Sequence, residues 1–482
     1  MKSIIYPASL CVLFFGCIDY NTDSGFTDED NRISGDVHLW QTTRNEYYLF
    51  KESAVDYTNE IGDFSIRLEP EKTYQEMDGF GAALTGSSAF LIKQMSDEQR
   101  SALLNDLFNP ETGAGMNYLR ITIGSSDFSM AMYTYCDKEG IENFAVPEID
   151  KRDLIPILKE ILTINPEIKI MASPWSPPAW MKTGGMLNGG QLKPDKYADF
   201  AAYFVKYVQA MAREGIAIDA VTLQNEAMFS SETHPTMLME WQQQAEIIRD
   251  YVGPGFRAAG ITAKILILDH NFDLYQYPIN VLNDINARQY VAGTAFHGYG
   301  GVPDAIDAVV AAHPDKEIYF SELSGGSGWN TDLETDRMET MFYYLTEYLI
   351  PCIQKGSKNF LMWNLALNTA NGPTTPGGTF CEECRGVVTV QPDYSYKKEL
   401  EYYLLGHFSK VCRTGSKRIS TSIAGKLPDK FYINAFLNPD GSKGVVLVNR
   451  SGNKAAVTLK DGDRRLTYTI QNDAVASFLI KN

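Results

Sequence analysis

Two glutamates, Glu226 and Glu322, each directly follow a short run of β-prone residues and are the side chains best suited to chemistry. Asn225 precedes the first glutamate and Ser321 precedes the second. Two carboxyl groups about 5–5.5 Å apart can cleave a glycosidic bond with retention, because one attacks the anomeric carbon while the other protonates the leaving oxygen. The pair therefore predicts a retaining glycosidase, provided that the fold brings the two residues together.

The elements that must position this pair are strands in a repeating β/α pattern. Continuous Ile, Leu and Val runs, rather than strict alternation, are typical of strands covered on both faces. Eight such units predict a (β/α)8 barrel over residues 75–410, with the two glutamates after its fourth and seventh strands. A doubly wound open sheet is the alternative, but no glycine-rich phosphate motif follows any strand. The expected strands are 77–84, 118–123, 168–173, 220–224, 263–268, 291–297, 317–320 and 359–363.

Beyond about residue 410 the sequence changes to short strands separated by turn signals such as Asn438-Pro-Asp-Gly441. Strands are expected at 431–436, 444–449, 455–459 and 474–480. The segment before the barrel, residues 37–74, also contains strand-like stretches. The sequence therefore predicts a side β-sandwich domain formed by residues 37–74 together with residues 411–482.

Polar and aromatic residues gather where the predicted barrel strands end, which is where barrel enzymes build their sites. Asn225 is placed to hydrogen-bond a sugar 2-hydroxyl, and Tyr299 to donate to Glu322 and hold it ionised. Asp127 and His297 also follow or end predicted strands and are candidate substrate-binding residues. Alternatively, Asp127 caps the turn that follows it, and His297 is a satisfied core histidine. The aromatic candidates for stacking on a sugar are Trp180 and Trp363.

The net charge is −17, and no dense cluster of Lys or Arg offsets it, so nucleic acid is not expected as a partner. A neutral sugar meets no such repulsion. Cys381 and Cys384 have the spacing of zinc ligands, but no second Cys/His pair matches them. We expect a local disulfide or free thiols there, and no metal or other cofactor.

Residues 1–17 have the pattern of an export signal, with Lys2 followed by the apolar run Ile4–Phe15. Gly16-Cys17 resembles the end of a lipoprotein signal, which would make Cys17 the lipidated first residue of the mature chain. An ordinary cleaved signal peptide is the alternative. Residues 18–36 are polar and acidic, as expected of a tether. The prediction is an exported protein of the bacterial cell envelope, a surface or periplasmic lipoprotein that contacts membrane only through Cys17.

Several motifs stand in one order along nearly the whole chain: Gly79-Phe-Gly-Ala-Ala-Leu-Thr85, Asp127-Phe-Ser129, Tyr133-Thr-Tyr135, Ala172-Ser-Pro-Trp-Ser-Pro-Pro-Ala-Trp180, Trp363-Asn-Leu-Ala-Leu-Asn368 and Gly406-His-Phe-Ser-Lys410. Together they resemble glycoside hydrolase family 30, and its glucosylceramidase-like branch in particular. The resemblance implies a (β/α)8 barrel with a side β-sandwich built from both chain ends, retention of configuration and no metal cofactor.

Residue by residue, the resemblance assigns the general acid/base to Glu226 and the nucleophile to Glu322. It implies a subsite that favours a β-linked glucosyl unit over xylose or fucose. The sequence departs from the family pattern at three positions, with Ala227 in place of Pro, Gly86 in place of Asp and Gly298 in place of Trp. The glucose-binding positions of the family fall on Asp127, Trp180, Asn225 and Trp363.

Three hypotheses for function follow from these observations. The first is a β-1,6-glucanase or β-glucosidase that acts on glucan, since a surface-tethered bacterial enzyme meets polysaccharide more readily than ceramide. The second is hydrolysis of glucosylceramide, a glycolipid. The third, of another class, is a surface glycan-binding protein on an inactive barrel, which predicts loss of one carboxylate, yet both are present.

Overall fold

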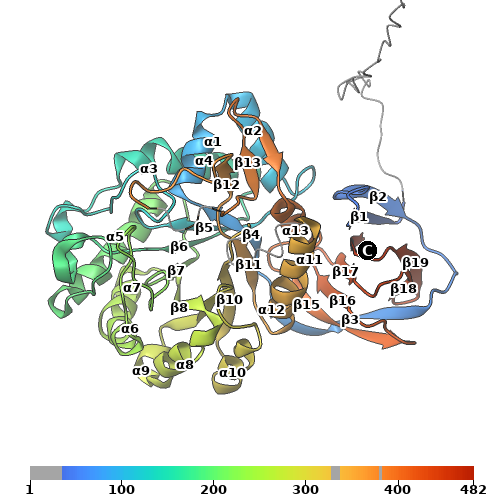
Figure 1. Ribbon diagram of the computed structural model, residues 1–482. Coiled ribbons are helices and arrows are strands. Elements are labelled where there is room, and N and C mark those ends of the chain that lie inside the picture. The colour runs from blue at the N-terminus through green and yellow to red at the C-terminus, as the bar shows by residue number, and fades with distance from the viewer. Residues whose placement is uncertain (1–34, 327–336, 379–380, 382, 482) are drawn as a thin grey trace, which may run out of the picture. The chain divides into compact units, whose positions relative to one another are not determined.

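A computed structural model describes residues 35–326, 337–378, 381 and 383–481, so the export signal and Cys17 lie outside the described residues. Its central element is a sheet of eight parallel strands, which confirms the predicted barrel (Figure 1). Bridges from Ile318 to Ser357 and from Ser324 to Trp363 join the two end strands of this sheet. In sheet order the strands are β10 (Glu317–Glu322), β9 (Val291–His297), β8 (Lys264–Asn271), β7 (Ala220–Thr222), β6 (Lys169–Ser173), β5 (Tyr118–Thr122), β4 (Gly79–Leu84) and β11 (Asn359–Met362).

Helices alternate with these strands, and their limits follow local sequence signals. Ser96 and Gln99 form the capping box that opens α2, and Gly215 in a left-handed conformation follows the end of α5. Among the described residues no helix is both long and apolar enough to cross a membrane. The helices are α1 (Gly86–Gln94), α2 (Asp97–Phe108), α3 (Glu148–Arg152), α4 (Leu154–Ile164), α5 (Tyr197–Arg213), α6 (Trp241–Ile247), α7 (Gly253–Ala259), α8 (Gln276–Asn283), α9 (Ile285–Arg288), α10 (Ala305–Ala312), α11 (Arg337–Tyr343), α12 (Ile350–Gln354) and α13 (Leu400–Ser409).

The interior of the barrel changes from apolar to polar along the strands. One buried cluster takes a single side chain from most strands: Tyr118, Met171, Ala220, Leu266, Ala295, Tyr319 and Leu361. Side chains two positions further along a strand point the same way. A second, polar layer of side chains therefore points into the barrel directly beneath the ends of the strands. It comprises Arg120, Ser173, Thr222, His297 and Ser321.

A second sheet, of nine strands, confirms the predicted side domain. Strands from opposite ends of this sheet pack in one hydrophobic core, so the sheet folds over on itself. The core includes Val37 of β1 and Ile480 of β20 together with Leu459 of β18 and Leu466 of β19. The N-terminal strands pair with the C-terminal ones, as the sequence predicts, and β15 and β19 were not predicted. The sheet order is β19 (Arg464–Ile470), β18 (Ala455–Asp461), β3 (Phe64–Glu76), β15 (Lys417–Ala424), β16 (Phe431–Leu437), β17 (Lys443–Asn449), β20 (Ala474–Ile480), β1 (Val37–Thr43) and β2 (Lys51–Val55).

A third, small sheet lies on the chain between β11 and α13. It comprises β12 (Ala366–Asn368), β13 (Val388–Val390) and β14 (Tyr396–Lys398). The hydroxyl of Ser88 in α1 donates to the carbonyl of Ala366, and α1 packs against β12, so this sheet is fixed to the first β/α unit of the barrel.

Candidate active site

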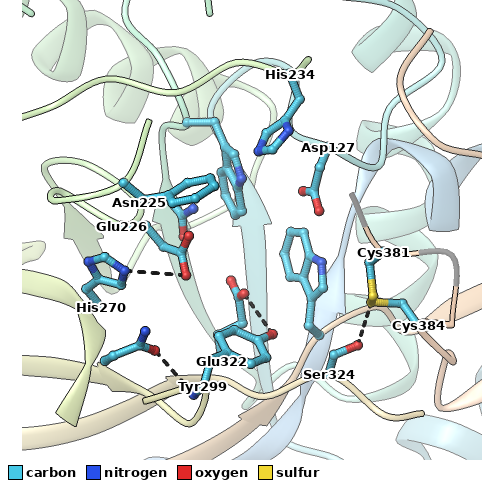
Figure 2. Close-up of a pocket in the computed structure, with 14 residues that line it drawn as sticks. Asp127, Asn225, Glu226, His234, His270, Tyr299, Glu322, Ser324, Cys381 and Cys384 are labelled. Carbon is cyan, nitrogen blue, oxygen red and sulfur yellow. Dashed lines mark hydrogen bonds and ion pairs between the residues drawn. A yellow bond between two sulfur atoms is a disulfide. The ribbon is translucent and has the colours of Figure 1, made fainter. Parts of the chain in front are cut away.

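Glu226 and Glu322 face each other where β7 and β10 end (Figure 2). One oxygen of each carboxyl and one ring nitrogen of His297 all lie within 4.8 Å of one another. Glu226 adopts a left-handed backbone conformation, with φ of 48°, and its N–H donates to the carbonyl of Asp269 at 2.8 Å. A non-glycine residue in this conformation is uncommon and is often found at functional sites.

Glu322 is held by two donors, one on β5 and one in the loop after β9. The Arg120 guanidinium donates to Oε2, and the Tyr299 hydroxyl donates to Oε1 at 2.9 Å. Arg120 is fully buried, and it also donates to Asn225 Oδ1 at 2.7 Å and to Asp269 Oδ2 at 2.8 Å. One guanidinium therefore fixes the nucleophile candidate and the asparagine beside Glu226 in the same arrangement.

Asp269 is the centre of the polar layer in the barrel. It accepts hydrogen bonds from Arg120, Thr222 and Ser321, and His297 Nε2 lies 3.0 Å from its Oδ1. Burial opposes ionisation, but Arg120 and His297 outweigh it and hold the pKa of Asp269 well below its usual range. The carboxylate is therefore a permanent anion that orients both its cationic neighbours.

His297 connects the two glutamates to Asp269. Its Nδ1 lies 3.3 Å from Glu226 Oε1 and 3.9 Å from Glu322 Oε1. Burial lowers the pKa of a histidine, yet the charges of Glu322 and Asp269 and the hydrogen bonds to Asp269 and Glu226 raise the His297 pKa to about 9. The imidazole is therefore doubly protonated and positively charged near neutral pH. It is buried and both of its nitrogens have partners, as in the alternative of a satisfied core histidine, but those partners include Glu226.

The pKa of each glutamate is shifted by burial and by the charged groups around it, and Glu226 is one of the groups that act on Glu322. Burial raises the pKa of Glu322, with the positive charges of His297 and Arg120 opposing the rise. At Glu226 burial has the same sign, but the hydrogen bond with His297 and the nearby positive charges outweigh it and lower the pKa. A proton retained by such a group belongs to the whole cluster rather than to one carboxyl.

The pair lines a cavity of about 260 Å³ at the mouth of the barrel (Figure 2). Asp127 lines it too, and its Oδ1 has no hydrogen-bond partner in the described structure. Burial and the charge of Glu322 raise the pKa of Asp127 to about 8. The lining consists of Asp127, Trp175, Asn225, Glu226, Phe229, His234, His270, Asn271, Tyr299, Glu322, Ser324, Trp363, Cys381 and Cys384.

The placement of Trp180 corrects the sequence interpretation. Trp180 is not among the residues lining the cavity, and its indole N–H donates to the carbonyl of Cys136 at 2.8 Å. Trp175, five residues earlier in the same motif, lines the cavity instead and stacks on Trp363 with ring centroids 4.9 Å apart. The Gln224 amide donates to the carbonyl of Trp175 at 2.6 Å, which ties this tryptophan to the end of β7.

Of the other predicted residues, Asp127, Asn225, Tyr299 and Trp363 line the cavity, and His297 lies beneath it. Sequence reasoning missed Arg120 and gave Asp269 no role. A signal for the first was available, because a charged residue inside the apolar run Tyr118–Ile123 must face a partner in the barrel. No sequence signal identified the lining residues Phe229 and His234.

Glu226, His297 and Glu322 also offer three atoms close enough to bind a metal ion, the one such group found among the described residues. The set suits a cation poorly, because the Arg120 guanidinium already contacts Glu322 and His297 carries a proton. Cys381 and Cys384 form a disulfide, as one of the two sequence alternatives expected, and are not metal ligands.

Comparison with known proteins identifies the family. The model of the glycosyl hydrolase family 30 TIM-barrel domain matches residues 77–412, and that of the family 30 β-sandwich domain matches residues 415–478. The chain belongs to glycoside hydrolase family 30. It is a retaining glycosidase that hydrolyses O-glycosyl bonds, and the proton donor and nucleophile such a reaction requires are both available at the mouth of the barrel.

Relatives in the family carry two kinds of name. An endo-1,6-β-D-glucanase of Neurospora crassa is 32% identical over 84% of this chain and 85% of its own length. The lysosomal acid glucosylceramidase of Mus musculus is 31% identical over 84% of this chain and 81% of its own length. A solved endo-β-1,6-glucanase superposes with a TM-score of 0.88 at 38% identity, covering 93% of this chain and all of that one.

The three departures from the family 30 pattern lie outside the lining of the cavity. Ala227 is fully buried in the barrel core. Gly86 is the first residue of α1, and a Cβ added to it would lie 3.2 Å from Ser129 Oγ. A Cβ on Gly298 would lie 3.0 Å from the Leu323 side chain and 3.1 Å from the Phe320 ring, so a larger side chain here requires these neighbours to shift.

Proposed function

We propose that this family 30 enzyme is an endo-β-1,6-glucanase, with Glu322 as nucleophile and Glu226 as general acid/base. The observation that carries the roles is the position of the two carboxyls, within 4.8 Å of each other, and the fact that Arg120 and Tyr299 donate to Glu322 and not to Glu226 among the described contacts. Such short separations belong to retaining enzymes, whereas inverting enzymes hold their carboxyls about 6.5–9.5 Å apart. The relatives named as β-1,6-glucanases support the linkage.

In the first step Glu322 attacks the anomeric carbon, the bond from that carbon to the glycosidic oxygen breaks, and Glu226 protonates the departing oxygen. Before this step the proton resides on His297, whose Nδ1 lies 3.3 Å from Glu226 Oε1, and it reaches the departing oxygen through Glu226; the proton that Glu226 takes from water in the second step returns to His297. When its Nδ1 proton moves to Glu226, the His297 ring becomes neutral and keeps its Nε2 proton on Asp269. The positive charge of Arg120 meanwhile keeps Glu322 ionised for attack.

In the second step Glu226 removes a proton from water, and the resulting hydroxide attacks the anomeric carbon of the glycosyl-enzyme. The bond to Glu322 breaks and the product keeps the β configuration. Asn225 Oδ1 accepts from Arg120, which turns the amide nitrogen toward the cavity and its sugar 2-hydroxyl. Trp363 supplies an apolar face for the glucosyl ring, and the free Oδ1 of Asp127 accepts from a sugar hydroxyl.

The decisive experiment follows the products of β-1,6-glucan by proton NMR while hydrolysis proceeds. We expect β-configured reducing ends first, and oligosaccharides of several lengths rather than glucose alone. β-1,3-glucan and glucosylceramide micelles are the matched substrates. Turnover of the lipid without turnover of the glucan would replace the proposed substrate, and initial α products would overturn the double-displacement roles.

The roles of the two glutamates are separated by leaving group. Glu322→Gln removes the nucleophile and should abolish turnover of every β-glucoside. Glu226→Ala should slow substrates with poor leaving groups far more than aryl glucosides with acidic phenols, since only the former need protonation. Equal losses on both kinds of substrate would contradict the assignment of Glu226.

We further propose that the chain is exported and anchored through a lipid on Cys17. The support is the sequence Leu13-Phe-Phe-Gly-Cys17 after an apolar run. Cys17→Ala should move the protein from the membrane fraction to the soluble fraction, with its activity toward aryl glucosides unchanged. A wild-type protein that is already soluble after export would contradict the anchor.

A further inference from the structure

A disulfide bond between Cys381 and Cys384 lines the same cavity as the two glutamates. Figure 2 shows it beside Ser324, on the side of the cavity that carries Asp127 and opposite Glu226. Because the general acid/base contacts the leaving group, the disulfide borders the part of the cavity that holds the retained sugar. Neither step of the proposed reaction uses it.

The disulfide packs against the aromatic residues that form the sugar-binding surface. Cys384 belongs to one buried cluster with Phe128, Trp175 and Trp363, and Cys381 packs on the same cluster. Trp363 is stacked on Trp175 with an interplanar angle of 21° and meets Phe128 edge-on. The disulfide therefore supports this stack.

The same segment is attached to the strand that carries the nucleophile. The Ser324 hydroxyl, two residues after Glu322, donates to Cys384 Sγ at 2.9 Å. Arg385 N–H donates to the carbonyl of Gly325 at 2.9 Å, and its guanidinium forms a partly buried ion pair with Glu401. Cys384 is thus anchored from both sides.

Among the described residues, Cys381 is held by the disulfide, by its apolar packing and by one long hydrogen bond, which its carbonyl accepts from the N–H of Cys384 at 3.5 Å. Its side chain is partly exposed, whereas Cys384 is 3% exposed. Breaking the disulfide would therefore remove a main contact that holds Cys381 against the aromatic cluster, while Cys384 keeps its attachments to Ser324 and Gly325.

We propose that the Cys381–Cys384 disulfide is a positioning element for Trp363 and the wall behind the retained sugar, and that its reduction by a dithiol weakens substrate binding. This inference rests on the proposed glucosyl subsite. A thiolate of the dithiol attacks Cys381 Sγ, the more accessible sulfur, and the second thiol then closes the reductant's own disulfide. The balance is one disulfide and one dithiol giving two cysteine thiols and one oxidised reductant.

The test compares oxidised and dithiothreitol-reduced full-length enzyme on 4-nitrophenyl β-glucoside and on β-1,6-glucan. We expect KM to rise about tenfold on both substrates while kcat changes less than about twofold, a loss of binding of about 1.4 kcal/mol. Reoxidation should restore KM. The aryl glucoside makes the test independent of the glucan linkage. If the oxidised enzyme hydrolyses the aryl glucoside but not β-1,6-glucan, the proposed substrate is refuted and the proposed role of the disulfide is not.

Cys381→Ser/Cys384→Ser is the matched control. It should have the KM of the reduced enzyme and no response to dithiothreitol, although it keeps the buried thiols Cys136, Cys352 and Cys412. A response that persists in this variant would assign the effect to those thiols and overturn the proposal. An unchanged KM would also overturn the proposal, provided that mass spectrometry has verified that the disulfide is reduced.

A second readout tests the location rather than the stability of the disulfide. A competitive iminosugar at ten times its Kd leaves about one site in eleven free, so reduction should slow about tenfold if the reductant enters through the cavity. Alkylation of Cys381 and Cys384, followed by mass spectrometry, measures the rate. Equal rates with and without the inhibitor would overturn the assigned position of the disulfide beside the bound sugar.

Discussion

Replacing Arg120 by glutamine tests the electrostatic design of the site most directly. Arg120 is fully buried and contacts two carboxylates, Glu322 and Asp269, and the amide of Asn225. Removing one partner of a buried ion pair costs about 3–5 kcal/mol, because an uncompensated charge remains. The described part of the chain is long enough to have an unfolding entropy of about 0.9 kcal/mol/K. The midpoint of thermal unfolding should therefore fall by about 3–5 °C.

The activity of Arg120→Gln should change in a way that stability cannot explain. The Arg120 charge lowers the pKa of Glu322, against burial, so its loss raises that pKa. A hydrogen bond to a charged group contributes about 1.5–3 kcal/mol, which corresponds to a rise of about one to two pH units. Glu322 must be ionised to attack, so the acidic limb of kcat/KM for an aryl glucoside should move up by that amount.

Two further variants separate charge from geometry. Arg120→Lys keeps the charge but loses the forked donor, so it should keep most of the acidic limb while kcat/KM falls, because a single ammonium cannot serve Glu322, Asp269 and Asn225 together. Arg120→Gln/Asp269→Asn removes both charges and should recover stability without recovering activity. If Arg120→Gln is destabilised but keeps its acidic limb, Arg120 is only a structural residue and the argument fails.

Four other residues give distinct expectations. Asp127→Asn should lower kcat/KM about 2–13-fold below pH 8, because the protonated Asp127 makes an uncharged hydrogen bond of about 0.5–1.5 kcal/mol with the sugar. Because the pKa of Asp127 is raised from 3.8 to about 8, folded wild type loses stability as pH rises through that interval, and thermal unfolding should favour the variant increasingly up to about pH 8. Trp175→Ala should lower kcat/KM at least about 100-fold, whereas Trp180→Ala should cost less than about threefold and act mainly on the unfolding midpoint. His297→Gln should slow poor leaving groups more than good ones, and a uniform loss would contradict its role as the proton source for Glu226.

The barrel and the two glutamates could be predicted because their signals are local. Each strand is a run of apolar residues, and each glutamate directly follows one. The choice between Trp175 and Trp180 could not be made in this way, since both occupy one proline-rich motif after β6. Which indole reaches the cavity depends on non-local contacts, the Gln224 amide on Trp175 and the Cys136 carbonyl on Trp180.

The polar layer beneath the site explains why the catalytic pair needs more residues than its motif contains. Two carboxyls within 4.8 Å repel each other in a buried site, and neither would be reliably ionised alone. Arg120, His297 and Asp269 supply two positive charges and one negative charge directly beneath them. With both glutamates ionised the five groups total one negative charge, so one proton can pass between His297 and Glu226 without leaving a strongly charged interior. The strand residues below the mouth thus set the protonation state that the reaction at the mouth requires.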